Sequence, residues 1–277
     1  MRKPLNGKQT FLIVMSLALV YVICFLSFAE VLMPKAGKQT KKNGSLVLDV
    51  SNMNEGYVLA KAAKSKKKQK LVVKTGKKQL QYDLNSKGNY EVIPLQYGNG
   101  KYTFTLFENV SGKKYSQSGT VSISAKMKDP NRAFLYPNQY VDYTAKTEAV
   151  LKATELCKGV TEPAEIAKII CNFVRKSFAY DYLKANSVKT NDTKGMMPAI
   201  DDTWNKHMGV CQDLSAVAVA MLRSQGVPAK LMIGDRKNVY HAWVSVIIDG
   251  DEKRFDPTAE LEGKKYKKTD YTLERFY

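Results

Sequence analysis

Three residue types that can carry acyl-transfer chemistry occur in order within one short stretch of the chain. Cys211, His241 and Asp256 lie within residues 209–258, and the 277-residue chain contains only one other histidine and three other cysteines. A thiol attacks an acyl carbon as the thiolate, so it needs an imidazole within hydrogen-bonding reach. The imidazole in turn needs a carboxylate that fixes its tautomer. These residues are therefore the predicted catalytic set of nucleophile, general base and orienting carboxylate.

The sequence places Cys211 at the N-terminus of a helix. An apolar stripe with helical spacing follows Cys211, and Gly226 and Pro228 end the pattern. The stripe consists of Leu214, Val217, Ala218, Met221 and Leu222. At such a position the helix macrodipole and the free N–H groups favour a thiolate and can also hold an oxyanion. Gly209 is predicted to let the chain turn tightly just before the nucleophile.

A hairpin is predicted to bring His241 and Asp256 together. Alternate residues from His241 to Ile248 read as two faces of a strand, with Ala242, Val244, Val246 and Ile248 facing the core. Asp249-Gly250 is a two-residue hairpin signal. This turn pairs Phe255 with Val244 and makes Asp256 a diagonal neighbour of His241, at the roughly 7 to 8 Å between Cα atoms that two side chains can span.

These segments resemble the transglutaminase-like superfamily, on GVCQDLSAVAVAMLRSQGVPAKLMIG, HAWVSV and RFDPT. The resemblance covers roughly residues 150–258, includes Tyr180-Asp181-Tyr182, and leaves out the basic region that precedes it. It implies an α+β, papain-like core in which helices pack on an antiparallel sheet. It also implies that Cys211 is the nucleophile, His241 the general base and acid, and Asp256 the orienter.

Four nearby residues receive other interpretations. Trp204 is similar in place to the tryptophan that helps the oxyanion in cross-linking members of the superfamily, but a packing role is favoured. Asp213 is predicted to complement the helix N-terminus, and Gln212 receives no catalytic role. His207 is interpreted as an exposed residue at the edge of the site. With two histidines and no CxxC or HxxxH motif, neither a metal nor a cofactor is expected.

The region before this core has the two-residue period of β-structure. Short runs rich in Val, Leu, Tyr, Phe and Thr alternate with turn residues over residues 45–128, which predicts a small β-sandwich-like domain. Residues 35–44 form a predicted basic linker and residues 129–142 a connector. The core domain, residues 143–277, is predicted to begin with helices at Tyr143–Cys157 and Glu162–Phe178, followed by a segment of little periodicity from Tyr180 to Gly209.

The first 34 residues are predicted to export the chain. A basic start precedes an uncharged apolar run over residues 11–29, which suits either a signal peptide cleaved near Ala29 or a retained membrane anchor. We favour the anchor, and with it an extracytoplasmic location. Three cysteines follow the run, an odd number, so at least one thiol is free. Cys157 and Cys171 are interpreted as small core residues.

The net charge of +18 is concentrated away from the predicted core domain. Residues 1–44 carry +6, residues 45–130 carry +9 and residues 131–277 carry only +3. Lysine outnumbers arginine 37 to 7, which favours a diffuse field over bidentate recognition of phosphates or bases. An anionic cell wall or membrane surface is thus a better expected partner than nucleic acid, and plain solubility remains an alternative.

The sequence therefore predicts an enzyme that forms a thioester from a peptide or glutamine amide at the cell surface. Water would make it a peptidase or amidase, whereas a lysine or another amine would make it a cross-linking acyltransferase. The substrate would be a protein or peptide. One alternative is a non-catalytic surface module whose basic β-domain engages an anionic cell-envelope polymer. Another is a mainly structural envelope protein.

Overall fold

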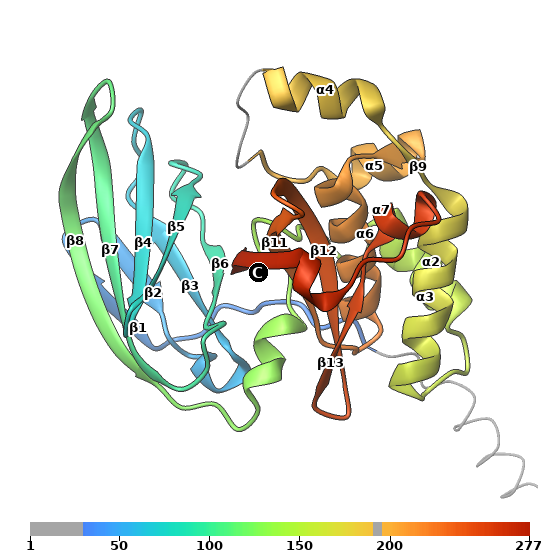
Figure 1. The fold of residues 1–277 in the computed structure, drawn as a ribbon. Helices are drawn as coiled ribbons and strands as arrows, with labels where there is room; N and C mark the ends of the chain where they lie inside the picture. Colours follow the sequence, from blue (N-terminus) through green and yellow to red (C-terminus); the bar gives the residue numbers. More distant parts are fainter. Residues whose placement is uncertain (1–29, 191–195) are drawn as a thin grey trace, which may run out of the picture.

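The computed structural model describes residues 30–190 and 196–277. The predicted signal or anchor at residues 11–29 lies outside this range. Among the described residues, no helix is both long and apolar enough to cross a membrane. The described chain forms two units side by side, a β-sandwich and a mixed α+β unit, and the C-terminus lies between them (Figure 1).

Two four-stranded antiparallel sheets form the sandwich, as residues 45–128 predict. One sheet has the order β1-β2-β3-β6 and the other β5-β4-β7-β8. Their inner faces share one hydrophobic core, to which Leu48 and Val58 contribute from the first sheet and Leu71 and Phe104 from the second. The strand bounds are β1 Thr40–Asn43, β2 Leu46–Asp49, β3 Tyr57–Ala62, β4 Gln69–Thr75, β5 Lys78–Leu84, β6 Glu91–Pro94, β7 Gly100–Ser111 and β8 Lys114–Ala125.

Two of these strands, β1 and β3, lack the two-residue period from which the β-rich region was predicted. β1 occupies the end of the expected linker, where Thr40–Asn43 pair with β2 although every side chain is exposed. β3 is buried on both faces because the connector covers its outer side, where the Tyr57 and Tyr136 rings lie 4.6 Å apart. Neither strand can show the alternation of buried and exposed residues that marks a half-buried strand.

The connector and the first helix differ from the prediction in one respect. A 3-10 helix spans Pro130–Phe134, and α2 spans Glu148–Leu156 rather than starting at Tyr143. The Tyr143 hydroxyl donates to the carbonyl of Leu135 (3.1 Å), and the backbone N–H of Thr144 donates to the hydroxyl of Thr147 (3.0 Å). The residues just before α2 therefore bind the connector instead of extending the helix.

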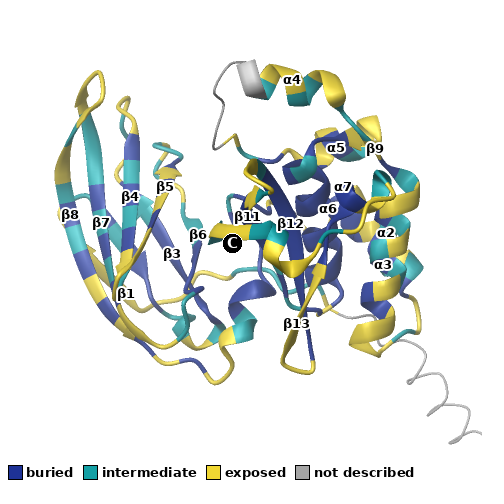
Figure 2. Ribbon diagram, in the orientation of Figure 1, coloured by how far each residue is buried: buried dark blue, intermediate teal, exposed yellow. Residues whose placement is uncertain are grey.

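In the α+β unit, one buried helix, α6, packs against a third four-stranded antiparallel sheet of order β13-β12-β11-β14. Figure 2 shows α6 almost wholly buried, and Gln212 to Ser224 are all buried. The bounds are α3 Pro163–Ser177, β9 Ala179–Tyr180, α4 Tyr182–Thr190, α5 Ile200–Lys206, β10 Met208–Gly209, α6 Cys211–Ser224, β11 Ala229–Arg236, β12 Val239–Ile248, β13 Asp251–Phe255, α7 Pro257–Leu261 and β14 Tyr271–Phe276, with 3-10 turns at Met53–Glu55 and Lys268–Asp270.

Aromatic packing and a buried arginine join the two units. The ring of Tyr277 stacks on Tyr140 and meets Tyr82 of the sandwich edge-on, with centroids 3.6 and 6.0 Å apart. Arg223, at the end of α6, is fully buried and donates to the carbonyls of Ala229, Tyr136 and Tyr277 at 2.7 to 2.9 Å. The helix that begins with Cys211 is therefore tied at its far end to both the connector and the last strand.

Candidate active site

Cys211 is the first residue of α6, as the sequence predicts. The two-stranded parallel pair of β10 and β9 leads into the helix, with Gly209 opposite Tyr180. The first N–H groups of a helix have no partner within the helix, so those at the start of α6 can bind an oxyanion. Cys211 is partly exposed. This combination suits a nucleophile better than a core cysteine.

Gly209 serves close packing rather than the tight turn that we predicted. Its φ lies outside the left-handed region, and a Cβ there would lie 2.8 Å from Cβ of Asp213. Asp213 is buried, accepts from the backbone N–H of Val210 (3.0 Å) and pairs with Lys184 of α4 (2.6 Å). This carboxylate caps the helix start, as predicted, and also anchors α4 beside it.

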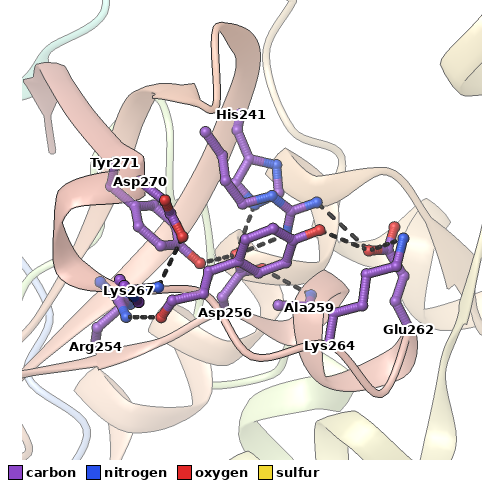
Figure 3. A network of polar contacts seen from close by, with 11 residues as sticks. His241, Arg254, Asp256, Ala259, Glu262, Lys264, Lys267, Asp270 and Tyr271 are labelled. Carbon is purple, nitrogen blue, oxygen red and sulfur yellow. Dashed lines mark hydrogen bonds and ion pairs between the residues drawn. The ribbon is translucent and has the colours of Figure 1, made fainter.

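The hairpin that carries His241 and Asp256 has the predicted register. Val244 pairs with Phe255 and Ile248 with Asp251, around a turn in which Asp249 and Gly250 both have positive φ. Nε2 of His241 lies 2.8 Å from Oδ2 of Asp256 (Figure 3). Asp256 occupies Nε2, so Nδ1 is the ring nitrogen left for a second partner, and the interaction with Cys211 contributes to the raised pKa of His241. The hairpin thus joins His241 to Asp256, and Cys211 lies near enough to influence the imidazole.

Asp256 does more than contact His241. It follows β13 directly and is the N-cap of α7, where Oδ1 accepts from the N–H of Ala259 (3.0 Å). Oδ2 accepts from His241 and also from the Arg236 guanidinium (3.0 Å) and the Tyr271 hydroxyl (2.7 Å). Both oxygens are occupied, so the carboxylate is fixed in position and orientation.

The sequence analysis missed Arg236 and Tyr271. Arg236 of β11 pairs with Tyr271 of β14. Arg236 and Gly234 lie on the same face of β11, and because Gly234 pairs with His241 of β12, the side chains of Arg236 and His241 lie on the same face of the sheet. The pairing of β11 with β14 shifts register between Ile233 and Gly234. The two strands approach closely there, because a Cβ on Gly234 would lie 2.0 Å from the carbonyl oxygen of Thr272. Alternation along β11 could have placed Arg236 on the histidine face, whereas no local pattern identifies Tyr271.

The electrostatics favour an ion-paired site. Burial alone would lower the pKa of His241, but the hydrogen bonds with Asp256 and Cys211 prevail and raise it to about 9. Burial would likewise raise the pKa of Asp256, yet its bonds with His241, Tyr271 and Ala259 lower it to about 2. At neutral pH the site therefore holds a carboxylate next to an imidazolium, which can stabilise a thiolate or protonate a departing amine.

Tyr271→Phe is expected to destabilise the protein by about 1.5 to 3 kcal/mol at pH 7, because a buried carboxylate loses a donor. The pKa of Asp256 is depressed in the fold, so this contribution is present above the unfolded value of about 3.9 and is lost as pH falls towards about 2. Urea unfolding at pH 7 and pH 3 should therefore give a smaller difference at pH 3. Tyr266→Phe is the matched control, since that hydroxyl contacts Glu262 at 3.5 Å, and equal losses in both variants would contradict the assignment.

The other candidate residues lie in supporting positions. The Trp204 ring packs on Phe173 and Phe178, and its N–H points to Glu148 (3.2 Å), which is the packing role that we favoured. The Gln212 side chain donates to the carbonyl of Met196 (2.7 Å). His207 is exposed, as predicted, and its ring lies 5.6 Å from that of Phe178.

The remaining described cysteines are poor nucleophiles. Cys157 is buried and Cys171 is partly buried against the core, and neither forms a disulfide. Burial raises the pKa of Cys157 to about 11 and that of Cys171 to about 12. Both thiols stay protonated at neutral pH, so Cys211 is the cysteine expected to react.

Comparison with known families identifies the part of the chain that contains these residues. Residues 152–257 match the family model of the Transglutaminase-like superfamily, and this part of the chain is a transglutaminase-like domain. The match includes Cys211, His241 and Asp256, and it supports a cysteine-based enzyme. No curated protein matches the chain.

Several solved structures are similar at low sequence identity. A candidate cysteine protease from Cytophaga hutchinsonii is 16% identical, with 71% of this chain and 68% of that chain covered and a TM-score of 0.38. The periplasmic domain of TgpA from Pseudomonas aeruginosa, bound to ethylmercury, is 14% identical, with 83% and 78% covered and a TM-score of 0.37. Red sea bream transglutaminase is 13% identical, with 73% and 48% covered and a TM-score of 0.29.

Proposed function

We propose that the protein is a cysteine-dependent acyl-transfer enzyme that acts on a peptide or glutamine amide through a thioester. The observation that carries the proposal is the hydrogen bond between His241 and Asp256, which favours the imidazolium, together with the place of Cys211 at the start of α6. The same contact argues against a non-catalytic module, because a core kept only for its shape needs no imidazolium next to a half-buried thiol.

The reaction uses each group in turn. The Cys211 sulfur attacks the amide carbon, and the resulting oxyanion lies against the N–H groups at the start of α6. The C–N bond breaks as His241 gives its proton to the departing amine, which leaves a thioester on Cys211. A water or a second amine then gives its proton to His241 and attacks the thioester, which releases an acid or a new amide. The location that we propose, outside the cytoplasm, rests on the apolar run at residues 11–29.

Thiol labelling tests the nucleophile without a known substrate. In the full chain, held in nonionic detergent, iodoacetamide at pH 6 is expected to alkylate Cys211 and to leave Cys157 and Cys171 unmodified by mass spectrometry. His241→Ala should slow this alkylation about 10-fold or more, because an ordinary thiol is less than about 1% thiolate at that pH. A Cys211 that labels at the same rate without His241 would rule out the ion-paired nucleophile.

A second assay separates hydrolysis from transfer. Casein with monodansylcadaverine offers glutamine amides, peptide bonds and an amine acceptor together. Fluorescent casein would identify a transferase, whereas shortened casein, or ammonia released without incorporation of the amine, would identify a hydrolase. Each activity should disappear in Cys211→Ala, and an activity that persists in this variant would come from a contaminant.

A further inference from the structure

A second candidate site lies on the outer face of the β5-β4-β7-β8 sheet. Its residues line a groove of about 570 Å³, with Lys68, Lys70 and Lys113 around Phe107 and Tyr115. The pairing of Lys70 with Phe107, and register shifts between β7 and β8 at Leu106/Phe107 and Asn109/Ser111, help shape this face. The groove belongs to the sandwich and contains none of the residues of the thiol site.

The groove carries an excess of positive charge. Five lysines occur in residues 64–70, and two more, Lys113 and Lys114, lie in the β7–β8 turn and at the start of β8. Within residues 30–190 and 196–277, the ion pairs do not include Lys68 or Lys113, and Lys70 reaches only the exposed Asp83 at 3.9 Å. Such a weak exposed pair contributes little stability, so Lys70 remains able to bind an external anion.

Two aromatic rings give the groove an apolar surface between the charges. Phe107 and Tyr115 are half-buried, and Nζ of Lys70 lies 5.0 Å from the centroid of the Tyr115 ring. The C–H face of a sugar ring packs on such surfaces, while carboxylate or phosphate groups on the same sugars reach the lysines. A concave surface suits a single polymer strand better than the flat surface of a bilayer, and the lysine ammonium lacks the planar fork with which arginine binds bases and phosphates bidentately.

We propose that this groove binds a segment of an acidic glycan, with sugar rings on Phe107 and Tyr115 and anionic substituents on Lys68, Lys70 and Lys113. The loop before β4 and the β7–β8 hairpin lie at the same end of the molecule as α4, beside which α6 begins (Figure 1). A glycan bound in the groove would therefore hold the protein on a polymer at the same end of the molecule as the thiol site. Binding needs neither thiol chemistry nor Cys211.

Binding to immobilised polygalacturonate at about 150 mM salt tests the proposal, since each sugar of this probe carries a carboxylate. Lys68→Gln/Lys113→Gln in the full chain is expected to bind at least 10-fold more weakly. Lys146→Gln/Lys158→Gln removes the same charge from exposed positions around α2 and should change binding less than 2-fold. Equal weakening in both double variants would overturn the proposal in favour of diffuse attraction.

Poly-glutamate and dextran separate the contributions of charge and of the sugar ring. Tyr115→Ala is expected to weaken polygalacturonate binding at least 3-fold and to leave the weaker poly-glutamate binding unchanged, while neutral dextran does not bind. Poly-glutamate bound as tightly as polygalacturonate would overturn the glycan assignment in favour of an acidic peptide. Cys211→Ala should bind like the wild type, so this test is independent of the enzymatic proposal, and unchanged thermal unfolding would show that the groove variants are folded.

Discussion

Asp256→Asn should lower the rate of acyl transfer about 10³-fold or more, while the protein stays folded. Both oxygens of Asp256 accept hydrogen bonds: Oδ1 from the start of α7, and Oδ2 from His241, Arg236 and Tyr271. An asparagine has one acceptor atom, so either the helix cap or the three donors must face an NH2 group. In either orientation the negative charge that stabilises the imidazolium is lost.

The variant should also change the pH dependence. In the wild type, activity is expected to fall as pH rises through about 9, because His241 then loses the proton needed by the leaving amine. Without the charge of Asp256 the pKa of His241 decreases, so this limb moves to lower pH. The measurement is the initial rate of casein turnover or amine incorporation from pH 5 to 10, whichever the wild type performs.

Asp270→Asn is the control for this prediction. Asp270 directly precedes Tyr271 in the C-terminal segment. It caps a 3-10 turn by accepting from the N–H of Lys267 (2.8 Å), and no hydrogen bond joins its side chain to the triad. Its variant should retain the wild-type rate within a factor of two or three. If Asp256→Asn retained a tenth of the activity with an unchanged pH profile, His241 would not depend on this carboxylate.

Arg223→Met is expected to destabilise the protein by about 3 kcal/mol or more. Three buried carbonyls, those of Tyr136, Ala229 and Tyr277, would lose the guanidinium donor at once, and Tyr277 would keep only the N–H of Leu231 (2.9 Å). Burial lowers the pKa of Arg223 to about 10, and removing this buried charge offsets part of the loss. Each buried carbonyl left without a partner costs about 1 to 3 kcal/mol, so the net effect remains a large destabilisation.

Urea unfolding followed by fluorescence would measure this loss. Arg223→Lys should be nearly as harmful, because one ammonium cannot reproduce the planar fork that reaches three carbonyls. Arg175→Met, which removes an exposed arginine 3.6 Å from Glu260, should change the free energy of unfolding by less than about 0.5 kcal/mol. Equal stabilities for the variants at 223 and 175 would mean that the junction between the two units contributes little.

Local rules were enough to predict three features of the site. These are the order of Cys211, His241 and Asp256, the start of α6, and the register between β12 and β13. Helix stops follow from Gly226 and Pro228, and the two-residue turn at Asp249-Gly250 fixes which side chains face one another. The β-rich region followed from its two-residue period in the same way. The exceptions, β1 and β3, are strands whose burial is uniform along their length.

Only the tertiary structure decided what surrounds the predicted residues. Tyr271 reaches Asp256 because β14 pairs with β11, and Tyr277 packs between the two units, yet neither residue has a local signal for its partner. Gly209 and Gly234 are required because other residues approach them closely, the side chain of Asp213 at Gly209 and the backbone of Thr272 at Gly234, and not because of their own conformation. A sequence specifies local period and turns residue by residue, whereas contacts between distant segments depend on the whole packing, and these contacts set the pKa values of His241 and Asp256.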